Sequence, residues 1–122
     1  MTMGRGAVKR INWPLMKESI ELTFDSLDEN KQYDKTEFYD IIIHHYRTLG
    51  RERIGYRGAV RQFARKGGKD TYRRVAQCVK ENTINRYGWK TYYKTTYFFT
   101  ADGNKHTKEK ATIKRNKNGH TK

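Results

Sequence analysis

Residues 91–115, TYYKTTYFFTADGNKHTKEKATIKR, decide the fold of the C-terminal half of this chain. The first nine of them are almost all Thr, Tyr and Phe, the residue types that favour strands. Asp102 and Gly103 follow as a typical two-residue hairpin turn, and a lysine-rich return strand over residues 105–115 comes next. The segment therefore predicts an antiparallel β-hairpin.

A two-residue loop at this turn fixes which residues face each other across the hairpin. It gives two pairs on each face: Tyr97 with Lys108 and Tyr93 with Thr112, then Phe98 with Thr107 and Tyr92 with Ile113. Because one face must pack on helices, we expect most of the rings to belong to the core. The alternative leaves some rings free to stack on unpaired bases: Tyr92, Tyr93, Tyr97 and Phe99.

Two helices are predicted in the N-terminal half. Pro14 suits the first position of a helix over residues 14–27, and Thr36 can cap a second helix that Gly50 ends. Both segments carry apolar side chains at helical spacing: Met16, Ile20, Phe24 and Leu27 in the first, and Phe38, Ile41, Ile42, His45, Tyr46 and Leu49 in the second. We expect these helices to form the base of the core.

A second pair of helices is predicted between the first pair and the hairpin. A short helix from Val60 ends at Gly67 and Gly68, and Asp70 or Thr71 can cap the helix that follows. The apolar stripe of that fourth helix consists of Tyr72, Val75, Ala76 and Val79. The expected fold is therefore α+β, a small single domain of about four helices followed by a C-terminal β-hairpin. It spans residues 13–115, between a flexible basic arm (1–12) and a disordered basic tail (116–122).

Residues 60–81 resemble a helix-turn-helix unit in length, turn chemistry and the polarity of the second helix. Ala64, Gly67 or Gly68, and Val75 are candidates for the small residue, the turn glycine and the branched apolar residue of that motif. The hairpin then follows as a wing follows the recognition helix in winged-helix proteins. The resemblance implies DNA binding, and the alternative is a plain αα-hairpin with a basic surface.

Charge is divided unequally between the halves of the chain. Residues 1–50 hold 7 Lys and Arg against 8 Asp and Glu, whereas residues 51–122 hold 20 against 5, and the whole chain carries a net charge of +14. Clustered like charges repel one another unless an anion neutralises them, so we expect a polyanionic partner. The alternative for the cluster around residues 57–74 is the acidic face of the first helix, formed by Glu18, Glu21 and Asp25.

The candidate nucleic-acid-binding residues lie in the basic half, on the helix pair and on the return strand. They are Arg57, Arg61, Arg65, Lys66, Lys69, Arg73, Arg74, Gln77, Lys80, Lys105, Lys108, Lys110 and Lys114. Arg73, Arg74, Gln77 and Lys80 lie on the fourth helix, and Arg and Gln match the polar edges of guanine and adenine. We expect these four to supply any sequence preference and the remaining cations to contact phosphates.

Enzymatic signals are weak, so no catalytic residue, metal or cofactor is expected. His44 and His45 are adjacent in a helix and point about 100° apart, which disfavours a shared metal ion. His45 fits the apolar stripe and is expected in the core, and the single cysteine, Cys78, is expected to be a buried small hydrophobe. No apolar run is long enough for a signal peptide or a membrane span, so a cytoplasmic protein with no membrane partner is expected.

These features give one leading functional hypothesis and two alternatives. The leading hypothesis is a non-enzymatic duplex-DNA-binding protein, acting in transcription regulation or DNA maintenance and of phage or mobile-element type. The first alternative is an RNA or single-strand binder that stacks bases on the hairpin rings. The second is an inhibitor or adaptor whose basic face docks on an acidic host protein or a nucleoprotein complex. A homodimer through the tyrosine-rich hairpin is compatible with each of them.

Overall fold

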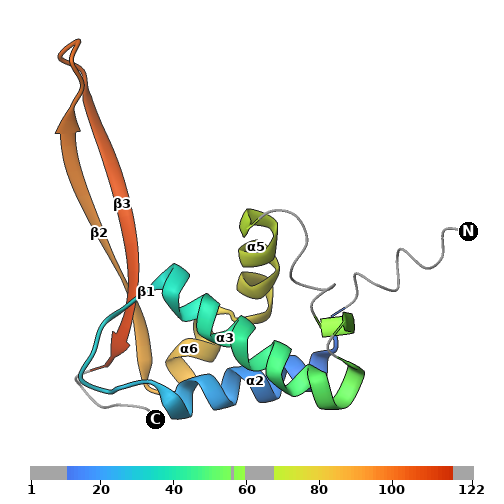
Figure 1. Cartoon of the computed structure of the whole chain (residues 1–122). Helices are drawn as coiled ribbons and strands as arrows, with labels where there is room; N and C mark the ends of the chain where they lie inside the picture. The colour runs from blue at the N-terminus through green and yellow to red at the C-terminus, as the bar shows by residue number, and fades with distance from the viewer. Residues whose placement is uncertain (1–10, 56, 60–67, 117–122) are drawn as a thin grey trace, which may run out of the picture. The chain divides into compact units, whose positions relative to one another are not determined.

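The computed structural model describes residues 11–55, 57–59 and 68–116. Over these residues the chain is α+β, with helices followed by a C-terminal β-hairpin, which confirms the predicted fold class (Figure 1). The chain groups into two compact units, one formed by residues 1–27 and 36–80 and the other by residues 28–35 and 81–122. Of the predicted arm and tail, only residues 11, 12 and 116 lie in the described part.

The first unit contains α2 (Trp13–Ser26), whose start is set by Asn12. The Oδ1 atom of Asn12 accepts a hydrogen bond from the backbone N–H of Leu15 at 3.0 Å, and Pro14 lies in the first turn. Such a cap satisfies one of the backbone N–H groups that a helix leaves unpaired at its N-terminus. The buried side of α2 includes the predicted stripe and three further residues: Leu15, Ser19 and Thr23.

The helix α3 (Lys35–Gly50) packs its aromatic and branched side chains inside the first unit. Phe38, Ile42 and Tyr46 are fully buried, and the rings of Phe38 and Phe24 lie 5.4 Å apart. The Tyr46 hydroxyl accepts a hydrogen bond from the Asn12 backbone N–H at 3.1 Å. The prediction that His45 lies in the core is wrong. The buried side of α3 includes Ile43, and His45 is only half-buried.

The π-helical turn η1 (Arg51–Gly55) follows α3, and Gly55 adopts a positive φ of +87° that suits glycine. The predicted third helix begins at Val60 and lies outside the described residues up to Gly67. The predicted fourth helix is present as α5 (Gly68–Cys78), which starts at Gly68 rather than at a cap on Asp70 or Thr71. The glycine turn of the helix-turn-helix hypothesis therefore does not include Gly68.

The buried side of α5 is made by residues at helical spacing. Val75 and Val79 are buried as predicted, and Thr71 joins them, whereas Tyr72 and Ala76 are half-buried. The Tyr72 hydroxyl donates a hydrogen bond to Asp40 Oδ1 at 2.5 Å, and its ring stacks 6.3 Å from that of Tyr39. These contacts fix α5 against α3 within the first unit.

The second unit is built around a three-stranded antiparallel sheet in the order β1-β3-β2. Its strands are β1 (Tyr33–Asp34), β2 (Trp89–Phe99) and β3 (Lys105–Arg115), and a short helix, α6 (Glu81–Arg86), precedes β2. Neither β1 nor α6 was predicted from the sequence. Tyr33, Ile84, Trp89 and Ile113 are buried, and the rings of Tyr33 and Trp89 lie 6.2 Å apart. A small core therefore covers only the base of the hairpin.

The predicted register of the hairpin is wrong by one residue. Tyr97 pairs with Thr107 and Phe98 with His106, so the connection is the three-residue loop 101–103. Within it the Gly103 N–H donates to the Thr100 carbonyl at 2.8 Å, and the Thr100 N–H donates to the Asn104 carbonyl at 3.1 Å. A two-residue type I′ turn needs positive φ at both central residues, and only Gly103 among the loop residues has one.

Candidate nucleic-acid interface

The corrected register places five lysines on one face of the ribbon formed by β2 and β3. Lys90 lies directly opposite Lys114, Lys94 opposite Lys110, and Lys108 opposite Thr96. Because cross-strand partners share a face and alternate residues of a strand change face, these side chains all project to the same side. We call this surface the lysine face: Lys90, Lys94, Lys108, Lys110 and Lys114.

The lysine face concentrates charge in a way that does not favour folding. Like charges directly opposite each other destabilise a sheet, and two such pairs occur here, each costing on the order of 0.2–1 kcal/mol. The Tyr92 ring lies on the same face, with the Nζ atoms of Lys114 and Lys90 at 4.9 and 5.8 Å from its centroid. Lys110 Nζ is 3.7 Å from Asp34 Oδ2, and since both side chains are largely exposed, this ion pair is weak.

Sequence reasoning missed Lys90 and Lys94, and of the predicted hairpin lysines only Lys105 lies outside the lysine face. Lys105 is opposite Phe99 and therefore lies on the other face, whereas Lys90 and Lys94 on β2 complete the row that the β3 lysines begin. A one-residue change of register moves every β3 side chain to the opposite side relative to β2. The Lys90 and Lys94 spacing of four matches that of Lys110 and Lys114, and this shared spacing was the available signal.

The opposite face of the ribbon carries exposed rings. Tyr93, Tyr97 and Phe99 are 57%, 61% and 69% exposed, so the expectation that most hairpin rings are core is wrong. The reason is that the core of the second unit ends at Thr91 and Ile113, and residues 93–99 and 105–110 are exposed on both sides of the ribbon. We call this surface the aromatic face: Tyr93, Tyr97 and Phe99. Figure 1 shows the ribbon extending beyond β1 and α6.

The α5 helix carries a second basic surface, within the first unit. Arg73 and Gln77 are exposed one turn apart on the side of α5 away from Val75, Arg74 is half-buried, and Lys80 is exposed two residues beyond the end of the helix. Arg57 is exposed as well. The other predicted residues are not placed: Arg61, Arg65 and Lys66 lie outside the described residues, as does the side chain of Lys69.

No protein-family model, curated protein or solved structure matches this chain.

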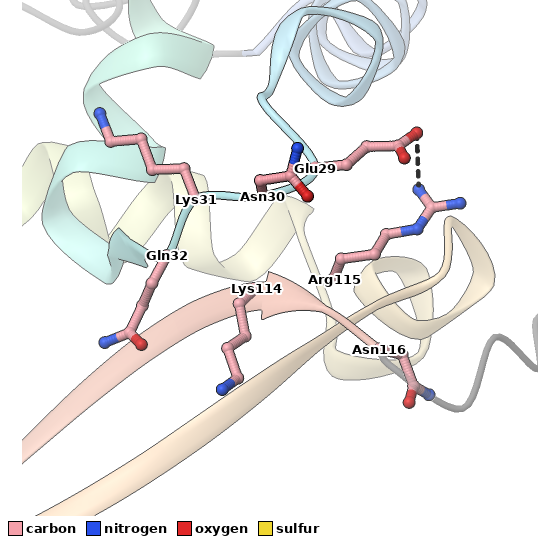
Figure 2. A pocket seen from close by; sticks show the side chains of 7 residues that line it. All are labelled: Glu29, Asn30, Lys31, Gln32, Lys114, Arg115 and Asn116. Atoms are coloured by element: carbon pink, nitrogen blue, oxygen red, sulfur yellow. Dashed lines mark ion pairs between the residues drawn. The ribbon is translucent and has the colours of Figure 1, made fainter.

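A polar surface pocket of about 430 Å³ lies beside the end of β3 in the second unit (Figure 2). It is lined by Glu29, Asn30, Lys31, Gln32, Lys114, Arg115 and Asn116. Arg115 is directed to Glu29, with Nη1 3.8 Å from Oε2, whereas Lys114 points from β3 in the other direction (Figure 2). Lys114 thus belongs both to the pocket wall and to the lysine face, whereas the exposed ion pair between Arg115 and Glu29 is weak.

The titratable side chains of the described residues form no cluster that could hold a metal ion. No group of three or more His, Cys, Asp and Glu side chains occurs there at metal-binding distance. Burial raises the pKa of the Cys78 thiol to about 11, which disfavours the reactive thiolate. Burial, and then the neighbouring His44, lower the pKa of the half-buried His45. No described helix is long and apolar enough to cross a membrane.

Proposed function

We propose that this protein binds nucleic acid through the lysine face without catalysing a reaction, and that duplex DNA is its principal ligand. The observation that carries the proposal is the pair of directly opposed lysines, Lys90 with Lys114 and Lys94 with Lys110. These opposed lysines repel each other in the free protein, and bound phosphates would neutralise them. A row of phosphates also matches a row of ammonium groups. Such a protein would act in the cytoplasm, as a regulator or DNA-maintenance accessory.

The dimensions of the ribbon support a duplex ligand. A two-stranded β-ribbon fits the major groove of B-DNA, which is about 12 Å wide. The part of the ribbon that is exposed on both sides covers residues 93–99 and 105–110, so it is free to enter a groove. In that position the lysine face meets phosphates. Arg73 and Gln77 of α5, with Lys80 after it, form a separate basic surface of the first unit for phosphate or base contacts.

A salt titration of duplex binding tests the proposal. Each neutralised phosphate contributes about −0.9 to the slope of log K against log salt, so five lysine contacts give a slope of about −4.5. We expect K94Q/K110Q to reduce this slope by about 2. The matched control is K17Q/R86Q, which removes the same charge from two exposed residues on helices and leaves the lysine face intact.

Two outcomes would contradict the proposal. A slope near zero for the wild-type chain would favour the adaptor hypothesis, in which an acidic protein is the partner. Equal losses for K94Q/K110Q and K17Q/R86Q would mean that diffuse charge, rather than the lysine face, attracts the duplex.

A further inference from the structure

The aromatic face carries three exposed rings on the side of the ribbon opposite the lysine face. Tyr93, Tyr97 and Phe99 lie on the same face of β2, with Thr95 between the first two, and their cross-strand partners are Ala111, Thr107 and Lys105. Two of these partners are short side chains, and the rings are more than half exposed. Three large exposed rings on one side of a ribbon mark an interaction surface rather than a packing surface.

We infer that the aromatic face stacks on the unpaired bases of a single-stranded nucleic acid. The inference rests on the proposed function and deepens it, because it adds a second ligand form and assigns each form to its own side of the ribbon. Base stacking on aromatic side chains is tolerant of sequence, since every base has a flat π-face, and exposed Tyr and Phe are the side chains that such sites use.

Spacing along the strand supports stacking at successive sites. Alternate residues of a strand are about 6.8 Å apart, so Tyr97 and Phe99 form neighbouring platforms and Tyr93 lies about 14 Å from Tyr97. Thr95, between Tyr93 and Tyr97, is opposite Glu109, and these two side chains interrupt the row of rings. The face thus offers a pair of adjacent stacking sites near the loop and a third site nearer the base.

Cations next to the rings provide the phosphate contacts. Lys105 Nζ lies 4.4 Å from the centroid of Tyr97, and Lys35 Nζ lies 6.0 Å from that of Tyr93. Lys105 is exposed and an exposed cation over a ring is held weakly, so a base stacked on Tyr97 can replace it while the ammonium group moves to the adjacent phosphate; Lys35 is half-buried beside Tyr93. Tyr97 and Tyr93 therefore each have a lysine close enough to contact the phosphate of a stacked nucleotide.

Charge distinguishes nucleic acid from the other occupants of such a face. A second copy of this chain would bring another net charge of +14 to the same ribbon, and repulsion would oppose the contact. The aromatic side of the exposed ribbon includes one acidic residue, Glu109, and one cation, Lys105. The net charge of the whole chain therefore favours a polyanion over a second copy, and the flat bases of a nucleic acid match the exposed rings.

The test compares Y97L/F99L with the wild-type full-length chain, using fluorescence anisotropy with labelled oligothymidine and with a mixed-sequence duplex of equal length. We expect affinity for oligothymidine to fall at least tenfold, since each lost stacking contact weakens binding by about 5- to 150-fold. We expect duplex affinity to change less than twofold. Phe98 is exposed on the opposite face, beside Phe99, so F98L is the matched control and should leave oligothymidine affinity unchanged.

Each alternative outcome overturns the inference in a recognisable way. Unchanged oligothymidine binding by Y97L/F99L rejects stacking, and the lysine-face proposal is then judged separately by K94Q/K110Q with duplex. Equal losses with both ligands would also reject it, because the rings would not distinguish unpaired from paired bases. Sedimentation without nucleic acid measures whether the chain dimerises through this face. A wild-type dimer that Y97L/F99L converts to a monomer would assign the aromatic face to a second copy of the chain. A melting temperature close to wild type verifies that the variant is folded.

Discussion

Gly103 determines the geometry of the hairpin loop through its backbone conformation. Its φ is +84°, and no heavy atom lies within 4 Å of the position that a Cβ would take. The cost of a side chain there is consequently backbone strain alone, which for the left-handed region is about 1–2 kcal/mol. Asp102 reinforces the loop, since hydrogen bonds from the Thr100 hydroxyl and the Asn104 backbone N–H lower the pKa of its carboxyl group.

Substitution of Gly103 should accordingly destabilise the fold without a steric clash. We expect Gly103→Ala to lower the free energy of unfolding by about 1–2 kcal/mol and Gly103→Asn to lower it by less, because Asn tolerates positive φ. Urea denaturation of the three chains measures the difference. Wild-type stability in Gly103→Ala would mean that the loop does not require the left-handed conformation.

Cys78 makes stability depend on pH in the alkaline range. Burial raises the pKa of its thiol from 9.0 to about 11, so the folded state favours the neutral thiol. Below pH 9 the thiol is protonated in both states, and the stability that its raised pKa contributes is fully present. As the pH rises from 9 towards 11, only the unfolded chain loses the proton, and the free energy of unfolding decreases. We expect the stability of the wild-type chain to fall relative to Cys78→Ala over this interval, in denaturation curves recorded at successive pH values. A constant difference between the two chains would show that the thiol is not protected in the folded state.

At the scale of elements, the ribbon is divided into a packed base and an exposed distal part. Ile113 is fully buried between β1 and β2, opposite Tyr33 on one side and Thr91 on the other. We expect Ile113→Ala to lower the free energy of unfolding by about 2–5 kcal/mol, as large-to-small core substitutions do. Thr107→Ala, on the exposed part of the same strand, should change it by less than about 0.5 kcal/mol in the same urea titrations. Similar values for both variants would contradict this division.

The lysine face predicts a change that stabilises the ribbon and weakens binding. Lys94→Glu converts the pair with Lys110 from like to opposite charges, which should stabilise the hairpin by about 0.2–1 kcal/mol at low salt. The same variant should bind duplex DNA less tightly than Lys94→Gln, because it adds a negative charge beside the phosphates. Thermal melts and anisotropy titrations follow the two effects. A loss of both stability and binding would indicate that the pair contributes to folding.

At the scale of the whole molecule, the basic surfaces belong to different compact units: α5 to the first and the lysine face to the second. If one duplex engages both, the contributions to the salt slope should add, since each neutralised phosphate releases its counterions independently. We expect R73Q/K80Q to reduce the slope by about 2, and its combination with K94Q/K110Q to reduce it by about 4. A combined effect no larger than that of one pair would assign duplex binding to a single surface.

The sequence by itself determined the elements whose signals are local. Pro14 and the apolar period that follows predict α2, and the Thr, Tyr and Phe run with Asp102 and Gly103 predicts a hairpin; the cap at Asn12 was not predicted. These signals lie within one element or one turn, where propensity and periodicity act directly. The charge imbalance that motivates a polyanionic ligand is likewise a property of the chain.

Tertiary structure alone decided the features that depend on contacts between distant residues. The two-residue strand β1 exists because Tyr33 and Asp34 pair with Ile113 and Thr112, about 80 positions away, and too few residues are involved to give a pattern. The lysine face depends on the register, which the three-residue loop 101–103 sets; a shift of one residue would move a whole strand of side chains to the other side. The exposure of the aromatic face depends on where the core of the second unit ends, and no residue type in β2 encodes that limit.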